Sequence, residues 1–394
     1  MFYFVVLFIL ILLCIRYDIN GKTRYRDQCY VIVIIILILI AGLRYRLGED
    51  TINYTYMFYY DTPYIYDIDI DLLLNSDQPP LWILLNSIIK TIGGKFFVVQ
   101  LIVAIVVNTL ILKYFKKHSL YPFACVAIFF FWRYLYFNMV LMKTAVVISI
   151  ILFANDYFLD KKYLKGLLLV LIATGFHQSA LLLILIPFLT FLRFNLLGVL
   201  LLIGTYFFSA FLQSKLGDVF QLLEFSDGVS NKLDNYLDSD FMTQVHNMNF
   251  FIVKFFPLLI YPIVSLIYLK HKCKESHIHR LEPFLMLGLI FQVMQFNIHI
   301  AYRFVYVFLP YFMIYMVHFL IDFSKNSLEL KGSLAYVRTL VVFLPLFASI
   351  AFFHPLTYTS FCPYSSVIEK SIDEAREKYY SGFVVHYYLK KDDY

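Results

Sequence analysis

Charged residues are scarce in this chain. Asp, Glu, Lys and Arg make up only 15% of its 394 residues, whereas 61% of the residues are apolar. A soluble domain of this length has a more polar composition, so that class of protein is excluded. The apolar runs are continuous rather than alternating, which argues against a membrane barrel. They predict a bundle of membrane helices, each satisfying its own backbone hydrogen bonds.

Three other features are missing. The five cysteines have no CxxC or other ligand spacing, so neither a disulfide nor a metal site is expected. No glycine-rich phosphate loop and no nucleotide-binding domain is present, which argues against a nucleotide-sugar donor used inside the cell. The first apolar run, residues 2–15, has no basic region before it and no cleavage site after it. It is therefore predicted to be a retained helix with its N-terminus outside.

Apolar stretches dominate what is present. Twelve of them qualify as spanning helices, because short spans survive inside a bundle. They are residues 2–15, 29–43, 96–112, 121–137, 139–158, 163–176, 178–193, 195–213, 249–269, 281–298, 302–321 and 334–353. Residues 79–94 instead carry one apolar stripe after Pro79-Pro80, a pattern typical of a helix lying in the membrane interface.

These stretches predict an all-α polytopic membrane protein with about twelve transmembrane helices and peripheral external helices. Residues 1–353 are expected to form a single membrane domain, and residues 354–394 an external C-terminal tail. The main external loops are expected at about 44–95 and 214–248.

The distribution of Lys and Arg predicts which loops are cytoplasmic. One set of alternate loops holds 17 of these residues, whereas the longer opposite loops hold 7. The positive-inside rule puts the first set in the cytoplasm; it comprises residues 16–28, 113–119, 160–165, 193, 270–280 and 322–333. The net charge of +6 is therefore explained by cytoplasmic loops that lie near anionic lipid. No nucleic-acid partner is expected.

Polar side chains are predicted to converge at the opposite, outer surface. Charges at membrane depth are costly, so they usually face a cavity and a partner. Each also has a structural interpretation: Arg46 reaching lipid headgroups, Arg133 and Lys143 pairing with carboxylates, His177 holding a helix end. Together, cations beside carboxylates suit a phosphorylated lipid. The predicted cluster consists of Arg44, Arg46, Glu49, Asp50, Arg133, Lys143, His177, His299 and Arg303.

The stretch LRYRLGEDTINYTYMF, residues 43–58, resembles the signature of the EpsG family, the Wzy-like polymerases of bacterial exopolysaccharide, capsule and O-antigen. That signature reads R-Y-x-hydrophobic-G-x-D-x-x-x-Y. It is matched by Arg44, Tyr45, Leu47, Gly48, Asp50 and Tyr54. The FHQS turn at 176–179 and YRFVYVFLPY at 302–311 resemble two further family segments.

One departure concerns the fifth helix. Family members commonly carry Arg-Gln a few residues before an Ala there, whereas this chain reads NMVLMKTAVVIS. Met142 falls near the position of the arginine, and Lys143 is the nearest cation. Arg133 or Lys143 would substitute for it.

The resemblance implies a membrane-embedded, metal-independent glycosyltransferase of GT-C type, without cofactor. It would lie in the bacterial inner membrane as a multi-pass protein, with its active site facing the periplasm or the cell exterior. Donor and acceptor would both be undecaprenyl-pyrophosphate-linked glycan. A chain-length regulator is a further expected partner, besides the lipid bilayer.

The resemblance also suggests roles for individual residues. Asp50 is the first candidate for the catalytic base and His177 the second. Gly48 would let the backbone turn tightly, and Tyr54 would contact sugar or lipid. The pyrophosphate would be bound by Arg44 and Arg303 with a cation from the fourth or fifth helix, Arg133 or Lys143, and Arg46 is an additional cation.

Other functions stay open at this point. A lipid-linked oligosaccharide flippase would carry charged residues along a path through the middle of the membrane, and its two halves would have similar sequences. This sequence shows neither feature. An O-antigen ligase shares the lipid-pyrophosphate donor and differs in its acceptor. A sugar O-acyltransferase would need its polar cluster near a cytoplasmic acyl donor. A structural partner of an assembly complex would tolerate loss of the external cations.

Overall fold

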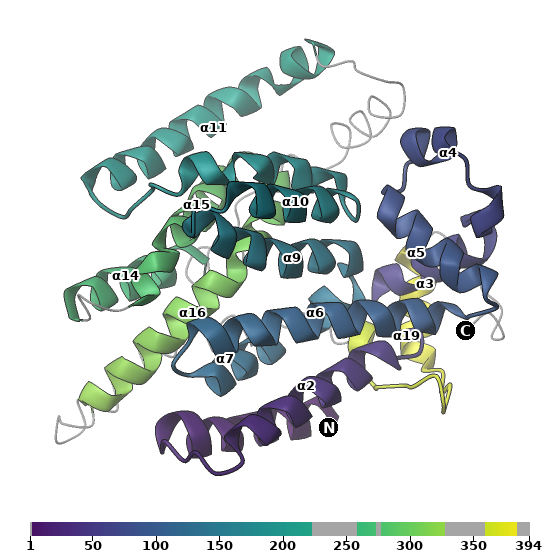
Figure 1. Ribbon diagram of the computed structural model, residues 1–394, viewed down its shortest axis with the longest axis horizontal. Coiled ribbons are helices and arrows are strands. Elements are labelled where there is room, and N and C mark those ends of the chain that lie inside the picture. Colours follow the sequence, from purple (N-terminus) through teal and green to yellow (C-terminus); the bar gives the residue numbers. More distant parts are fainter. Residues whose placement is uncertain (1, 223–257, 273–276, 328–358, 384–394) are drawn as a thin grey trace. The chain divides into compact units, whose positions relative to one another are not determined.

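The computed structural model describes residues 2–222, 258–272, 277–327 and 359–383 (Figure 1). In this part of the chain every regular element is a helix, apart from an isolated bridge between Arg44 and Ser366. The contacts divide the chain into two units, which are described separately. The first comprises residues 1–187 and 353–394, and the second comprises residues 188–352.

The first unit contains most of the helices drawn in purple, blue and yellow in Figure 1. Its N-terminal elements are α1 (Phe2–Leu13), η1 (Cys14–Ile19), α2 (Arg26–Gly42), α3 (Glu49–Tyr56), η2 (Met57–Asp61), η3 (Ile65–Asp67), α4 (Ile70–Asn75) and α5 (Pro80–Thr91). They are followed by α6 (Phe96–His118), α7 (Pro122–Phe129), η4 (Phe130–Tyr134), α8 (Leu135–Met139), α9 (Met142–Leu159), α10 (Tyr163–Thr174), η5 (Gln178–Leu189) and, near the C-terminus, α19 (Glu374–Phe383).

Helix α2 is apolar on both its buried and its exposed face. Its buried residues Tyr30, Val33 and Leu37 recur every three or four positions and pack toward α6. The opposite face is equally apolar, yet Val31 and Ile35 are about half exposed. An exposed apolar face of this kind is expected where a helix contacts lipid.

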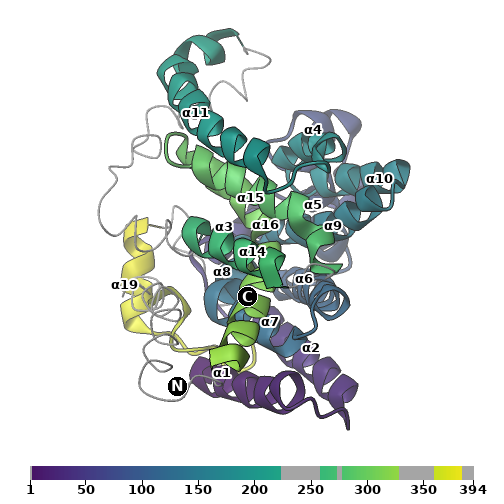
Figure 2. The same cartoon turned by 90° about the vertical axis from the view of Figure 1, so that its left-hand side faces the viewer.

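Hydrogen bonds also join the helices of this unit. The hydroxyl of Tyr30 donates to the carbonyl of Leu112 at 2.7 Å, joining α2 to α6. The amide of Asn108 on α6 donates to the side chain of Asn138 on α8 at 2.8 Å. Such interhelical hydrogen bonds in membranes each contribute about 0.6 kcal/mol. Figure 2 shows α2, α6 and α7 in a view turned by 90° from that of Figure 1.

The second unit is built around α15 (Glu282–Met294) and α16 (Tyr302–Ser327). A Cβ on Gly288 would lie 2.5 Å from the ring of Phe312, so glycine permits their close approach. Lys270 and Glu282 form an ion pair at 2.5 Å, and the Glu282 carboxylate also accepts the backbone N–H of Phe194 at 2.6 Å. The remaining elements are α11 (Leu196–Leu222), α14 (Tyr261–Lys272), η7 (His277–Leu281) and η8 (His299–Ala301).

The prediction of an all-α protein is confirmed for the described part of the chain. Five helices in the described part of the chain are long and apolar enough to cross a membrane; they cover Phe2–Ile19, Phe96–His118, Met142–Leu159, Leu196–Gln213 and His299–Phe323. The total of about twelve spans stays a prediction. The predicted spans 163–176 and 178–193 coincide with shorter apolar helices, the 12-residue elements Tyr163–Thr174 and Gln178–Leu189.

Several other predictions concern residues at the edges of the described part. The predicted span 334–353 lies outside the described residues, as does most of the predicted loop 214–248. Only the second part of the predicted span 249–269 is described, within α14. The division into a membrane domain over 1–353 and a tail over 354–394 stays a prediction, although described residues of that tail belong to the first unit.

Candidate functional site

The signature loop, residues 43–48, joins α2 to α3, and Arg44 is buried inside it. Its guanidinium donates to the carbonyls of Ala41 and Leu47, the latter at 3.3 Å. It also lies 3.4 Å from the hydroxyl of Thr51 and 3.1 Å from the sulfur of Met142. Arg44 therefore connects the end of α2, the loop, the first turn of α3 and the start of α9.

Gly48 makes the turn before α3. Its φ of +91° lies in the region that favours glycine. A Cβ at this position would lie 2.3 Å from the carbonyl oxygen of Met139, at the end of α8. The hydroxyl of Thr51 lies 2.9 Å from the same oxygen. The φ angle and this close approach to α8 both favour glycine at the turn.

A C-terminal strap, defined here as residues 359–383, covers the signature loop. Backbone hydrogen bonds connect the two: Tyr45 N–H donates to Ser365 O at 2.9 Å, and Gly48 N–H donates to Ser360 O at 3.1 Å. Val367 N–H donates to the carbonyl at the end of α2, on Leu43, at 2.9 Å. The loop is thus held by chain segments more than 300 residues away in sequence.

Arg46 forms the main ion pair between loop and strap. Its Nε and Nη2 donate to the two carboxylate oxygens of Glu377 at 3.1 and 2.9 Å. The side chains are only 5% and 14% exposed, so this bidentate pair is largely shielded from solvent. Arg46 also has a φ of +50°, in the left-handed region. The contact gives Arg46 a partner that is not a lipid phosphate.

The two acidic residues that open α3 have different surroundings. The carboxylate of Glu49 accepts hydrogen bonds from Ser360 Oγ at 3.0 Å and Tyr379 Oη at 2.9 Å. Burial and the neighbouring Glu49 raise the pKa of Tyr379, which therefore stays protonated and donates at neutral pH. Asp50 follows, half-buried in the first turn of α3, where the helix dipole favours negative charge.

Lys143 lies half-buried in the first turn of α9, next to the Met142 that contacts Arg44. Its Nζ donates to Gln78 Oε1 at 2.8 Å. The same Nζ lies 5.1 Å from the ring centroid of Tyr54 and 5.7 Å from that of Trp82. Aromatic faces stabilise a cation at these distances. Lys143 thus places a half-buried positive charge next to the buried Met142 in the first turn of α9.

His177 lies in the turn between α10 and η5, which packs against the start of α5. Leu81 N–H donates to Gly175 O at 2.8 Å there. The Nδ1 of His177 accepts the backbone N–H of Ser179 at 3.3 Å and lies 2.8 Å from its hydroxyl. An N–H can only donate, so this geometry assigns the proton of the neutral ring to Nε2.

The structure brings most of the predicted residues to one end of the first unit. Direct contacts join the loop of Arg44, Arg46 and Gly48 to α8, α9 and the strap, and join Lys143 to Tyr54 and α5. Arg133 lies in the π-helical turn η4, half-buried, with its guanidinium 5.5 Å from the ring of Trp132. Arg303 opens α16 in the second unit, beside the ring of Tyr302.

Sequence reasoning missed the residues that hold the loop in place. Glu377, Tyr379 and Ser360 lie in a segment that was predicted only to be an external tail. The additional arginine at position 46 was a signal that a carboxylate partner exists, but nothing in the sequence says which one. Trp82 and Gln78, on the segment around the start of α5, were likewise not singled out.

The sequence of this chain matches the model of one protein family, the EpsG family, over residues 28–366. The chain belongs to the EpsG family. The matched region begins within α2, contains the signature loop, Lys143 and His177, and ends at Ser366, the residue bridged to Arg44. A search of curated proteins and a search of solved structures each found no match.

Membership of the EpsG family suggests a polysaccharide polymerase type of function, and the apolar helices indicate a membrane protein. An EpsG protein is in general a glycosyltransferase-like polymerase, so a lipid bilayer and a lipid-linked glycan are consistent partners. Among the described residues no group of three or more His, Cys, Asp or Glu is arranged to hold a metal ion.

Proposed function

We propose that this EpsG-family protein joins undecaprenyl-pyrophosphate-linked oligosaccharide repeats into a surface polysaccharide: O-antigen, capsule or exopolysaccharide. The reaction would take place at the outer face of the bacterial inner membrane. The observation that carries the proposal is the family match across residues 28–366, which includes the folded signature loop. We further propose a metal-independent enzyme of GT-C type, assisted by a chain-length regulator.

The proposed reaction transfers a growing glycan from one lipid pyrophosphate to the next lipid-linked repeat. A hydroxyl oxygen of the acceptor sugar forms a bond to the anomeric carbon of the donor. The bond from that carbon to the pyrophosphate oxygen breaks, and its electron pair leaves with undecaprenyl pyrophosphate. The hydroxyl proton passes to a base, for which Asp50 is the candidate.

Lys143 is the cation that we assign to the leaving pyrophosphate. It is half-buried rather than enclosed, and a single ammonium suits a phosphate as a point charge. Placed there, it would stabilise the negative charge that develops as the sugar bond breaks. Tyr54, which is half-buried, would lie against the sugar or the lipid, with the buried Trp82 behind it at a ring-centroid distance of 5.5 Å.

Arg44 fits a positioning role better than direct contact with substrate. It is fully buried, and its contacts reach three helices and the loop. In the proposal it holds the loop so that Asp50 and Lys143 keep their relative positions. His177, with a proton on Nε2, would donate a hydrogen bond to a phosphate or sugar oxygen. The assignments of Arg46, Arg133 and Arg303 to the pyrophosphate stay predictions.

A complementation experiment tests the proposal. A deletion strain receives wild type, Asp50→Asn or Lys143→Gln, and its surface glycan and lipid-linked fraction are analysed. Matched controls are Asp71→Asn on α4 and Lys165→Gln on α10, which remove the same charges at exposed positions. Loss of a general base typically lowers the rate about 10²- to 10⁴-fold. Both site variants should therefore lose the long-chain ladder and accumulate single lipid-linked repeats outside the membrane.

Other outcomes would refute the assignment. Repeats trapped on the cytoplasmic side would identify a flippase. Full-length polymer left on its lipid carrier would identify a ligase. A normal ladder in both site variants, at normal protein levels, would mean that neither residue takes part in the chemistry.

A further inference from the structure

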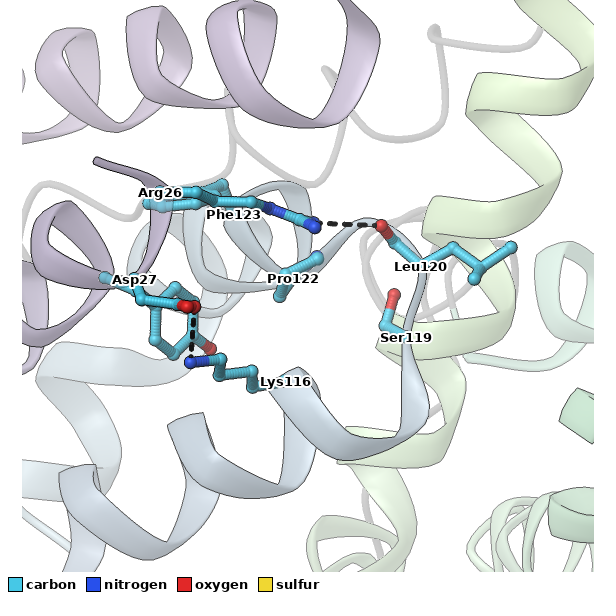
Figure 3. A pocket seen from close by; sticks show the side chains of 8 residues that line it. Arg26, Asp27, Lys116, Ser119, Leu120, Pro122 and Phe123 are labelled. Carbon is cyan, nitrogen blue, oxygen red and sulfur yellow. Dashed lines mark hydrogen bonds and ion pairs between the residues drawn. The ribbon is translucent and has the colours of Figure 1, made fainter. Parts of the chain in front are cut away.

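A second polar site lies at the opposite end of α2 from the signature loop. It is a pocket of about 190 Å³ between the start of α2, the end of α6 and the start of α7 (Figure 3). Because α2 has 17 residues, the two sites are about 25 Å apart along its axis. The lining residues are Arg26, Asp27, Tyr30, Lys116, Ser119, Leu120, Pro122 and Phe123.

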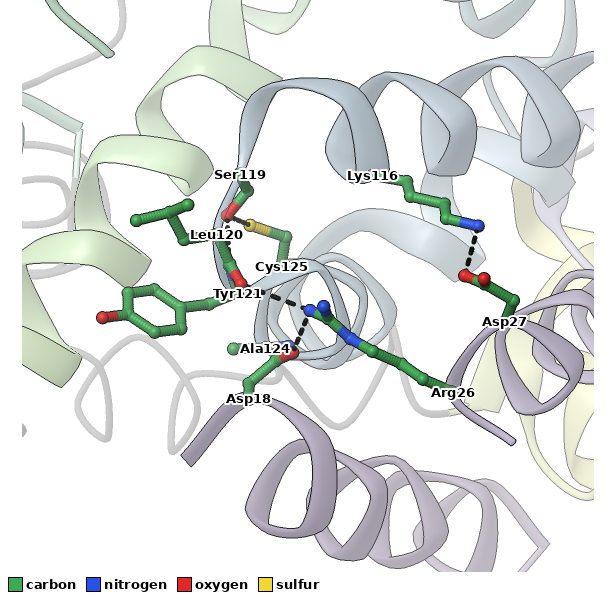
Figure 4. Close-up of polar contacts among 9 residues, drawn as sticks. All are labelled: Asp18, Arg26, Asp27, Lys116, Ser119, Leu120, Tyr121, Ala124 and Cys125. Atoms are coloured by element: carbon green, nitrogen blue, oxygen red, sulfur yellow. Dashed lines mark hydrogen bonds and ion pairs between the residues drawn. The ribbon is translucent and has the colours of Figure 1, made fainter. Parts of the chain in front are cut away.

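Two cations at the rim of this pocket, Lys116 and Arg26, keep the capacity to bind a further anion. Lys116 Nζ lies 2.7 Å from Asp27 Oδ1, but the two side chains are 45% and 76% exposed. Exposed ion pairs contribute only about 0–1 kcal/mol, so another anion can compete for this lysine. Arg26 uses one nitrogen, Nη2, for bonds of 3.3 Å to Asp18 and to the carbonyl of Leu120 (Figure 4). A guanidinium has five N–H groups, so Arg26 retains donors for phosphate oxygens.

The nearest buried acid, Asp18, pairs with Arg26 through Oδ1 and is held by α7 through its other oxygen, so it does not offset the charge of Lys116. Asp18 Oδ2 accepts the backbone N–H of Ala124 at 2.8 Å, in the first turn of α7. Its side chain has no solvent exposure. Asp18 thereby fixes α7 and orients Arg26 at the rim. The surrounding loops, residues 16–28 and 113–119, hold seven Lys and Arg against two Asp.

The surface beside the pocket is apolar. Asp27, at the rim, is followed on the same face of α2 by Val31, Ile35 and Leu39, which are spaced four residues apart. These three side chains are 51%, 49% and 46% exposed. A soluble phosphate would make no use of this stripe, whereas a lipid would cover it with acyl chains. The combination of a basic rim and an adjoining exposed apolar helix face therefore indicates a lipid with a phosphate headgroup.

We propose that this pocket binds the phosphate group of an anionic phospholipid, with its acyl chains along Val31, Ile35 and Leu39 of α2. The topology predicted from the basic loops puts the pocket on the cytoplasmic side, where anionic lipids attract Lys and Arg clusters. A bound lipid there would seal the contact between α2, α6 and α7 at the end of the bundle away from the proposed chemistry. The proposal does not depend on the reaction assigned to the outer site.

The test uses the full chain in detergent and native mass spectrometry. Phosphatidylglycerol and phosphatidylcholine with identical acyl chains are titrated against wild type, Lys116→Gln and Arg26→Gln. Lys113→Gln is the matched control, because Lys113 is an exposed lysine one turn earlier on α6 and does not line the pocket. Each cation near the membrane surface contributes about fivefold in affinity. Wild type and Lys113→Gln should prefer phosphatidylglycerol, and Lys116→Gln should lose about fivefold of that preference.

Three results would overturn the proposal. One is equal affinity of wild type for the two lipids. A second is an equal loss in Lys113→Gln and Lys116→Gln, which would indicate a general charge effect. The third is displacement of phosphatidylglycerol by millimolar inorganic phosphate, which would indicate a site for a soluble anion. If Arg26→Gln fails to fold through loss of its contact with Asp18, the exposed Lys116 still provides the test.

Discussion

At the scale of single residues, the signature stretch has two kinds of position. Arg44, Tyr45 and Leu47 have no solvent exposure and serve the loop itself. Asp50 and Tyr54 are half-buried and lie where a ligand can reach them. The buried residues are needed for the loop to fold. The half-buried residues are the ones that we expect to take part in the reaction.

Gly48 gives the sharpest prediction for one residue. Gly48→Ala should lower the thermal unfolding temperature of the purified protein and abolish polymer synthesis, because its Cβ would lie 2.3 Å from Met139 O. Gly93→Ala is the matched control: φ is +76° there and no atom lies within 4 Å of the added Cβ. The control should cost only the backbone strain of about 1–2 kcal/mol. Equal effects of the two substitutions would show that contact with α8 does not constrain the loop.

At the scale of elements, α19 is the helix on which the candidate site depends most. Its Glu377 forms an ion pair with Arg46, and its Tyr379 donates a hydrogen bond to Glu49. These contacts hold the residues before and after Gly48, at the turn into α3. Breaking a buried ion pair at one partner leaves the other charge uncompensated.

Glu377→Gln should therefore destabilise the protein by about 2–4 kcal/mol, measured by thermal unfolding, and reduce the polymer made in the complemented strain. Glu374→Gln on the same first turn of α19 is exposed and should change stability by less than about 0.5 kcal/mol. Because both variants lose the same contribution to the helix dipole, their difference isolates the contact with Arg46. Indistinguishable variants would argue that the strap does not stabilise the loop.

The elements also show what could be predicted from sequence. The apolar runs at 96–112 and 139–158 became α6 and α9 because their length and hydropathy leave few alternatives. The run at 178–193 became a twelve-residue 3₁₀ segment containing Pro187, which its composition alone did not indicate. The segment of α19 is short and polar, and its partner Arg46 lies 331 residues earlier. No local pattern encodes that pairing, so the strap could not be predicted.

At the scale of the whole molecule, the predicted topology places the two ends of α2 on opposite sides of the membrane, and this can be tested. Lys22 lies before α2, on the side of the basic loops, and Asp71 lies on α4 in the loop after α2; both are exposed. In a variant without native cysteines, Asp71→Cys should react with a membrane-impermeant maleimide in spheroplasts. Lys22→Cys should react only after lysis. The opposite result would invert the orientation and place the signature loop in the cytoplasm.

The contact between Arg46 and Glu377 also has a consequence for biosynthesis. The ribosome must add 331 further residues after Arg46 before its partner exists. At bacterial rates of about 5–20 residues per second this takes roughly 20–60 s. Throughout that time the signature loop exists without the C-terminal strap that binds it. A nascent chain would thus acquire its finished loop only near the end of translation, so chains interrupted before residue 377 would remain without it.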